Sequence, residues 1–280
     1  KARAAPAADA AETSGKPPSA SPSSTAVGST SEGSAATPTA SPTSDEQAPT
    51  VLNGFSVIPE LVTIQLEESE IAPFSLPQEA LTFQPRDSDV VARFQNKDAE
   101  RMIFCNTQLE AQELTWLERC RAQAKKEGLS FLPSVTVAAG RFLGDVKGDT
   151  EIALQRMRDS QKWRQDFFKD GPITAPSIAE DMKFGILYFC GRDTSLRPAL
   201  VVRPNRTPAD LVNEPVAHRF NRLFMFCMEY FLRYMVVPGR VENLSVICDL
   251  DGLSVSQIPL KALLEVQKVM SQQYAGRVFH

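Results

Sequence analysis

The chain has 280 residues, a formal net charge of −4 and no run of Lys and Arg, which excludes the electrostatic footprint of a nucleic-acid-binding protein. No apolar stretch approaches the roughly 18 residues that a membrane-spanning helix needs, so the sequence predicts no integral membrane protein. Within 1–50, 40 residues are Ala, Ser, Thr, Pro or Gly, and Val27 is the only large aliphatic residue. We predict a disordered tail over 1–50, because such a stretch cannot bury enough apolar surface to offset the entropy of ordering.

The cysteines and histidines predict neither a disulfide framework nor a metal site. The five cysteines are odd in number and widely spaced, without a Cys-x-x-Cys pair, which fits a reducing compartment. The two histidines, His218 and His280, have no second ligand or triad partner near them in the sequence. We therefore expect a cytoplasmic protein with no catalytic residue, no metal and no cofactor.

Residues 51–105 are an extension or linker whose structure the sequence leaves open. Short strands at 55–58 and 61–66 are compatible with the pattern, but prolines interrupt the segment at intervals. A structured extension that packs on the following domain and a flexible linker are equally compatible with it.

Residues 106–172 carry the pattern of a helical N-terminal subdomain. A first helix should end at Gly128, and a second should begin at Asp149 or Thr150 and end at Gly171-Pro172. The expected apolar face of the first helix consists of Leu109, Leu114, Leu117 and Cys120. That of the second consists of Ile152, Ala153, Met157 and Trp163.

Residues 173–280 alternate strands and helices, which predicts an α/β domain. Strands are expected at 184–190, 198–203 and 244–250, and helices at 214–237 and 258–274. The order implies right-handed crossovers and a mixed or parallel sheet with flanking helices. The apolar run at 244–250 predicts a strand covered on both faces. Because only three strands are evident, we expect the sheet to continue beyond residue 280, so that this domain is incomplete.

The strand at 244–250 leads into Asp249-Leu250-Asp251-Gly252, which resembles the haloacid-dehalogenase phosphotransferase signature. In that signature the first Asp is the nucleophile and the second is the acid/base. The alternative is structural: Asp249 ends the strand and Asp251-Gly252 forms the turn. A phosphotransferase that uses Asp249 and Asp251 is thus the less favoured of the functions considered.

The helix at 214–237 has apolar side chains around most of its circumference. This is typical of a core helix packed against a sheet, and it is also compatible with a helix that lines an apolar cavity for a hydrophobic ligand. Tyr230 and Tyr234 are spaced i, i+4, so both hydroxyls can lie on one face and contact a polar headgroup.

Three groups of residues follow one another along the chain: Arg141-Phe142-Leu143, Ala153-Leu154, Met157-Arg158 and Trp163-Arg164; then 188–203; then Asp249-Leu250, Gly252, Ser254, Tyr274 and Arg277. In this order they resemble the CRAL-TRIO lipid-binding family, which includes the phosphatidylinositol/phosphatidylcholine transfer proteins. The first group is similar to the family's helical N-terminal subdomain, the second to its G-x-D-x-x-GRPV hairpin, and the third to its DLxGxS strand-turn and YPER helix end. The resemblance covers about 135–280.

The resemblance implies a non-enzymatic protein that holds one lipid in an apolar pocket and exchanges it with membranes during transient peripheral contact. We expect a monomer whose domains are the tail (1–50), the extension (51–105), the helical subdomain (106–172) and the lipid-binding domain (173–280). The expected pocket residues are Tyr188, Phe189, Leu200, Val202, Phe224, Cys227, Tyr230, Phe231, Tyr234, Val246 and Cys248. Strand alternation allows only about half of the strand residues to face the pocket.

The sequence departs from the family at residues that contact phospholipid headgroups in its members. Leu244 and Val246 occupy the positions of a Ser-x-Thr pair, Gly276 replaces an acidic residue, and Leu196-Arg197-Pro198 replaces the GRP turn. A sterol, isoprenoid or fatty-acyl ligand therefore remains an alternative to a phospholipid. A regulatory or membrane-targeting interaction module without transfer activity is the alternative function.

Overall fold

The computed structural model describes residues 50–95, 98–208, 211, 217–253 and 260–279. The tail predicted over 1–50 therefore lies almost wholly outside the described residues, as does Ser254 of the family resemblance. Residues 47–280 form one unit. The boundary predicted at residue 172 between a helical subdomain and a lipid-binding domain stays a prediction.

The extension at 51–105 is built from short elements. Its strands are β1 (Val51–Leu52), β2 (Phe55–Val57), β3 (Ile64–Gln65), β4 (Val91–Arg93) and β5 (Ala99–Arg101), and its helical turns are η1 (Glu68–Glu70), η2 (Pro73–Ser75), α1 (Gln78–Thr82) and α2 (Asp87–Val90). β2 pairs in parallel with β6 (Ser130–Phe131), and β3 pairs in parallel with β7 (Ile173–Thr174). Phe55 and Ile64 are buried. The segment is thus a structured extension that adds strands to two later parts of the chain.

The helical part follows as α3 (Ala111–Lys126), α4 (Pro133–Val137), α5 (Ala139–Asp145) and α6 (Thr150–Phe167). The Asp149 carboxylate caps α6 by accepting a hydrogen bond of 3.0 Å from the backbone N–H of Ile152, as the sequence predicts. Gly128 follows α3 with φ of 65°, a conformation that glycine adopts without a steric penalty. Both helix boundaries are therefore set by local sequence.

The predicted apolar faces of these helices are wrong at two positions. Leu114 of α3 is 47 % exposed and Ile152 of α6 is 49 % exposed. On α3 the neighbouring Glu113 turns inward instead and pairs with Arg101, at 2.6 Å between its Oε2 and the guanidinium Nη2. On α6 the inward position belongs to the buried Leu154. An inward polar partner and a one-residue shift of the buried stripe account for the difference.

A four-stranded mixed sheet occupies the C-terminal part. Its strands are β8 (Leu187–Arg192), β9 (Pro198–Val202), β10 (Leu244–Cys248) and β11 (Val278–Phe279), in the order β11-β10-β9-β8. β8 and β9 form an antiparallel hairpin, whereas β9, β10 and β11 are parallel. Helical elements that the structure describes in this part are α7 (Ala175–Met182), η3 (Pro204–Arg206), α9 (Ala217–Tyr230), the π-helical turn η4 (Phe231–Met235) and α10 (Leu260–Gln273). The α/β class and the mixed sheet are confirmed.

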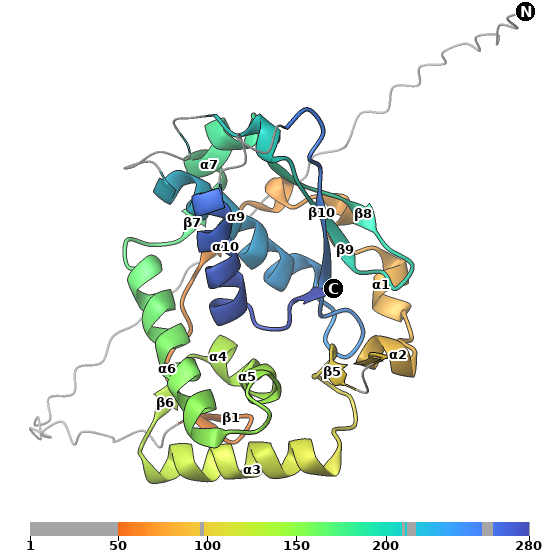
Figure 1. The fold of residues 1–280 in the computed structure, drawn as a ribbon. Coiled ribbons are helices and arrows are strands. Elements are labelled where there is room, and N and C mark those ends of the chain that lie inside the picture. The colour runs from red at the N-terminus through yellow and green to blue at the C-terminus, as the bar shows by residue number, and fades with distance from the viewer. Residues whose placement is uncertain (1–49, 96–97, 209–210, 212–216, 254–259, 280) are drawn as a thin grey trace, which may run out of the picture. The chain divides into compact units, whose positions relative to one another are not determined.

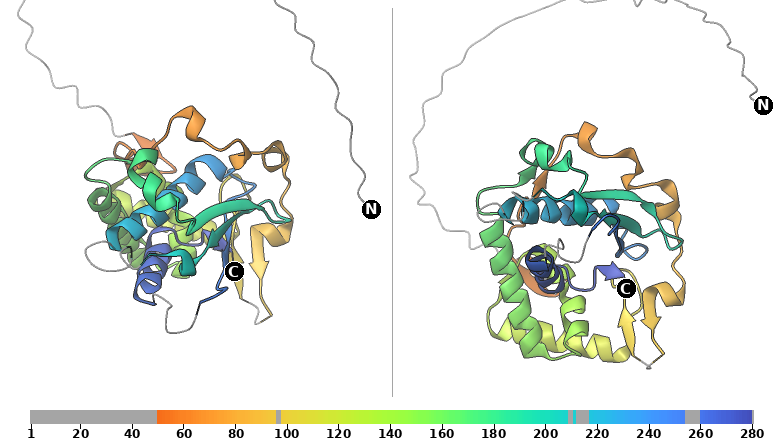
Figure 2. Two further views of the ribbon diagram at one scale, coloured as in Figure 1. Left: turned by 90° about the horizontal axis from the view of Figure 1, so that it is seen from above. Right: turned by 45° about the horizontal axis from the view of Figure 1, so that its top comes forward.

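The helix α9 packs against β8, and α10 packs against α9 and α6 (Figure 1). Figure 2 shows the same helices from two further directions, with α10 seen nearly end-on in its right-hand view. One apolar cluster surrounds α9 and includes Leu200, Leu223 and Phe231; a second fills the helical part around Phe142 and Leu154. The predicted helix over 214–237 changes character at Tyr230, where the α-helix gives way to η4.

Candidate functional site

The strand register divides the predicted pocket residues between the two faces of the sheet. Leu200 is paired with both Phe189 and Val246, and Val202 with Cys248, so these five side chains lie on one face. That face carries α9, because Leu200 and Val202 belong to the apolar cluster around α9. Tyr188 pairs with Val201 and therefore points to the opposite face.

Most of the predicted pocket residues belong to a packed interior between the sheet and α9. Six of them are buried: Leu200, Val202, Phe224, Cys227, Tyr230 and Phe231. Phe189 and Tyr234 pack against them, with ring centroids 6.2 Å from Phe189 to Tyr230 and 5.1 Å from Tyr230 to Tyr234. Three cavities of about 540, 590 and 670 Å³ in the described part are lined by other residues.

β10 leaves this interior as it runs toward its C-terminal end. Leu244 is fully buried, but Val246 is 37 % exposed and Ile247 is 49 % exposed, and Cys248 is exposed as well. The expectation that 244–250 is covered on both faces is therefore wrong. The apolar run correctly located a strand of a parallel sheet, but its second half carries apolar side chains that face solvent. Val246 and Cys248 are thus the exposed members of the predicted pocket set on the α9 face.

The Tyr230 hydroxyl, which the sequence suggests for contact with a headgroup, is already used inside the protein. It accepts a hydrogen bond of 2.9 Å from the backbone N–H of Ala72 and lies 2.5 Å from the Ser75 hydroxyl. Tyr230 therefore attaches the extension to α9.

The two aspartates of the phosphotransferase-like string have structural partners. Asp249 Oδ2 lies 3.0 Å from Arg203 Nε, and Asp249 Oδ1 accepts a hydrogen bond of 3.1 Å from the backbone N–H of Asp251. The backbone oxygen of Asp251 accepts a hydrogen bond of 2.6 Å from the Asn205 side chain. These contacts join the ends of β9 and β10 and stabilise the turn at Asp251-Gly252.

The residues that carry the family resemblance converge on two buried ion pairs that the sequence did not reveal. In the first, Arg141 of α5 lies 2.8 Å from Glu242, which precedes β10, and both side chains are almost fully buried. Glu242 also accepts hydrogen bonds from the backbone N–H groups of Phe104, Cys105 and Gly239. Burial alone would raise the pKa of Glu242, but Arg141 and these donors outweigh it and lower the pKa.

The second ion pair joins four parts of the chain. Arg164 of α6 lies 2.9 Å from Glu229 of α9. Glu229 also accepts hydrogen bonds of 2.7 Å from Thr63 in the extension and 2.7 Å from Tyr274 after α10. Burial and the adjacent Glu229 carboxylate raise the pKa of Tyr274 well above its usual value, so its hydroxyl stays a donor. The glutamates lie outside the family motifs, and only their long-range contacts identify them.

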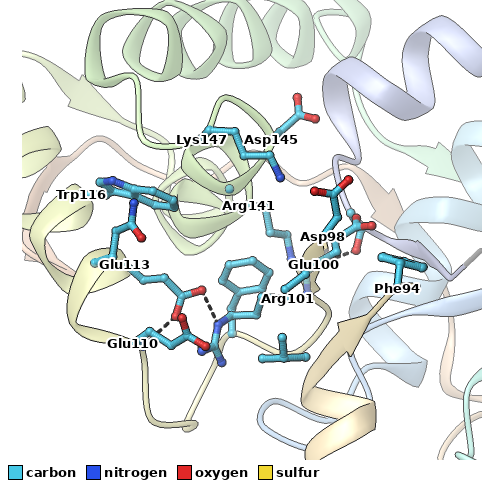
Figure 3. Close-up of a pocket in the computed structure, with 16 residues that line it drawn as sticks. Phe94, Asp98, Glu100, Arg101, Glu110, Glu113, Trp116, Arg141, Asp145 and Lys147 are labelled. Carbon is cyan, nitrogen blue, oxygen red and sulfur yellow. Dashed lines mark hydrogen bonds and ion pairs between the residues drawn. The ribbon is translucent and has the colours of Figure 1, made fainter. Parts of the chain in front are cut away.

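A cavity of about 540 Å³ lies between β4, β5, α3 and α5 (Figure 3). Its labelled walls combine the carboxylates of Asp98, Glu100, Glu110, Glu113 and Asp145 with Arg101, Arg141 and Lys147, and with the rings of Phe94 and Trp116. The Glu113 carboxylate inside it is hydrogen-bonded to Arg101 and to the backbone N–H of Glu110. So many charged groups make these walls unsuited to an acyl chain, and none of the predicted pocket residues lines them.

Residues 182–280 match the family model of the CRAL/TRIO domain. The match begins at the last residue of α7 and includes β8, β9, α9, β10, α10 and β11. CRAL/TRIO domains bind lipids or other small hydrophobic ligands and are generally not enzymes. No curated protein matches the chain significantly. In the described residues, no helix has the length and apolar character needed to cross a membrane.

Proposed function

We propose that the CRAL/TRIO domain binds one lipid molecule on the α9 face of β10, beside the exposed side chains of Val246 and Cys248. The observation that carries the proposal is the emergence of β10 from the core within a domain that belongs to a family of hydrophobic-ligand binders. Register pairs Val246 with the buried Leu200, so a ligand there would extend the interior apolar surface.

The gain in free energy would come from removing apolar surface from water on both partners. Each CH₂ group of an acyl chain contributes about 0.8 kcal/mol when it is buried, so a chain competes with its place in a bilayer only where it meets an apolar wall. The buried residues Phe224, Cys227 and Tyr230 of α9 pack in the same apolar cluster as Leu200 and Val202, which continues the apolar surface beneath the proposed site. We propose further that the protein exchanges this lipid with membranes as a cytoplasmic monomer with transient peripheral contact, and that the ligand is a phospholipid.

Adjacent residues of β10 provide a matched test. Val246→Glu places a carboxylate on the α9 face, and Ile247→Glu places the same group on the other face of the same strand. Lipid bound to the purified full-length chain is measured by native mass spectrometry and solvent extraction, and transfer of a labelled phospholipid is measured between vesicles. We expect Val246→Glu to reduce lipid occupancy at least about tenfold, because a charge at an apolar contact costs more than about 1.4 kcal/mol.

Ile247→Glu should leave lipid occupancy within about twofold of the original, and equal losses in both variants would contradict the assignment of the face. Wild-type protein that carries no lipid and transfers none would overturn the lipid proposal. The alternative is an interaction module without transfer activity. The dense packing of the six buried pocket residues favours this alternative, and wild-type protein without bound lipid or transfer activity would support it.

A further inference from the structure

A small cavity lies where the helical part meets the end of α10. It has a volume of about 40 Å³, and its walls include Arg141, Ser160, Arg164, Gln273, Tyr274 and Arg277. α6 contributes Ser160 and Arg164, and Gln273 is the last residue of α10. The cavity thus borders the second ion pair, in which Arg164 contacts Glu229.

Two buried polar atoms of residues that line this cavity have no hydrogen-bond partner among the described residues: Arg164 Nε and Gln273 Oε1. The Arg164 side chain is only 6 % exposed, and its Nη2 atom is committed to Glu229. The great majority of buried polar groups in native proteins are paired, so two unpaired atoms on residues that line the same cavity point to an occupant.

The chemistry of the two atoms defines that occupant. Arg164 Nε–H can only donate a hydrogen bond, and Gln273 Oε1 can only accept one. An anion would satisfy the first and repel the second, and a cation would do the reverse. Water both donates and accepts, and about 10–15 Å³ is enough space for one molecule. We propose that a water molecule occupies this cavity, accepts from Arg164 Nε–H and donates to Gln273 Oε1.

This water would close a ring of hydrogen bonds. Arg164 donates to Glu229, and Glu229 accepts from Tyr274, which follows Gln273 directly. The water joins Gln273 back to Arg164, so α6 is linked to the C-terminal end of α10 through two adjacent residues, Gln273 and Tyr274, instead of one. It acts as a structural site between the helical part and the CRAL/TRIO domain, and it is independent of whether a lipid binds.

The test uses ¹⁵N-labelled full-length protein. The Nε–H resonance of Arg164, assigned by its loss in Arg164→Lys, should show a dipolar cross-peak with water whose sign indicates a long-lived molecule. Gln273→Leu should remove this cross-peak and lower the Tm by about 2–4 °C. Gln272→Leu, the same change at an exposed neighbour, should do neither.

Absence of the cross-peak in the wild-type protein would overturn the proposal, since the cavity would then be dry. A Gln273→Leu variant at least as stable as Gln272→Leu would also overturn it, because deletion of a truly unpaired acceptor relieves a cost instead of breaking a contact. If Gln273→Leu does not fold, the wild-type cross-peak decides alone.

Discussion

Glu229 accepts hydrogen bonds from three side chains in the protein interior. Arg164, Thr63 and Tyr274 all donate hydrogen bonds to its carboxylate, and each comes from a different part of the chain. Glu242 has the corresponding role for Arg141. Arg141, Arg164 and Tyr274 belong to the motifs that resemble the family. At least part of that resemblance therefore consists of residues that hold the helical part against the sheet domain.

Removal of the Glu229 charge should therefore destabilise the folded protein. Glu229→Gln preserves the shape of the side chain but leaves Arg164 buried without a counter-charge, and we expect a loss of about 3–5 kcal/mol in the free energy of unfolding. Glu180→Gln is the matched control, because Glu180 pairs with Lys183 at the surface and should contribute less than about 1 kcal/mol. Urea unfolding of both variants measures the difference, and similar losses would contradict this account of the interior.

At the scale of elements, Asp89 fastens α2 to the turn between β8 and β9. Its carboxylate accepts hydrogen bonds of 2.9 Å from Arg86 Nε and 2.7 Å from the Ser195 hydroxyl. The hydrogen bond from Arg86 outweighs the effect of burial, and together with that from Ser195 it lowers the pKa of Asp89 from 3.8 to about 2. The charged carboxylate is thus the form that holds the two elements together.

This contact should make stability depend on pH in a defined window. Because the folded-state pKa is below the unfolded one, the stabilisation is complete above pH 3.8 and is lost as the pH falls toward about 2. Asp89→Asn should therefore have a lower Tm than wild type near neutral pH. This difference in Tm should narrow as the pH falls from 3.8 to about 2. Thermal unfolding from pH 7 to pH 2 measures this gap, with the exposed Asp87→Asn as control. A gap that stays constant with pH would argue against the charge as its source.

The elements themselves were largely predictable from the sequence, whereas their contacts were not. Asp149, Gly128 and Gly171-Pro172 mark helix ends through local backbone chemistry, and the sheet strands were located by their apolar runs. Periodicity cannot say that β3 will pair with β7, or that Glu242 will meet Arg141. It also shows which side chains of β10 are apolar, but not whether another element covers them.

The candidate site illustrates the same limit. The expected pocket residues lie on β8, β9, α9, η4 and β10, and the register brings most of those on the strands to one face. It could not separate the buried Leu200 from the exposed Val246, because both are aliphatic residues of adjacent parallel strands. That distinction depends on how α9 crosses the sheet, which is a property of the packed chain.

At the scale of the whole molecule, the extension at 51–105 ties the helical part to the sheet domain. Phe55 packs in the cluster of the helical part, whereas Ile64 packs in the cluster around α9. Thr63 adds its hydrogen bond to Glu229. A segment with no family match thus contributes to both apolar clusters.

Two N-terminal deletions should separate the extension from the tail. Removal of residues 1–46 should leave the Tm unchanged, because their composition offers almost no apolar surface to bury. Removal of residues 1–66 also takes away Phe55, Thr63 and Ile64, and it should lower the Tm by more than about 10 °C, since each large core side chain contributes about 2–5 kcal/mol. Equal Tm values for the two deletions would show that the extension is dispensable.

The C-terminal half of β10 has a consequence for how the molecule must be handled. Val246 and Ile247 point to opposite faces of the sheet and are 37 % and 49 % exposed, and Leu250 just after the strand is 52 % exposed. Clustered apolar side chains in water bind other apolar surfaces, including further copies of the same chain. Light scattering at rising protein concentration should therefore detect self-association that a bound lipid, or Ile247→Lys, suppresses.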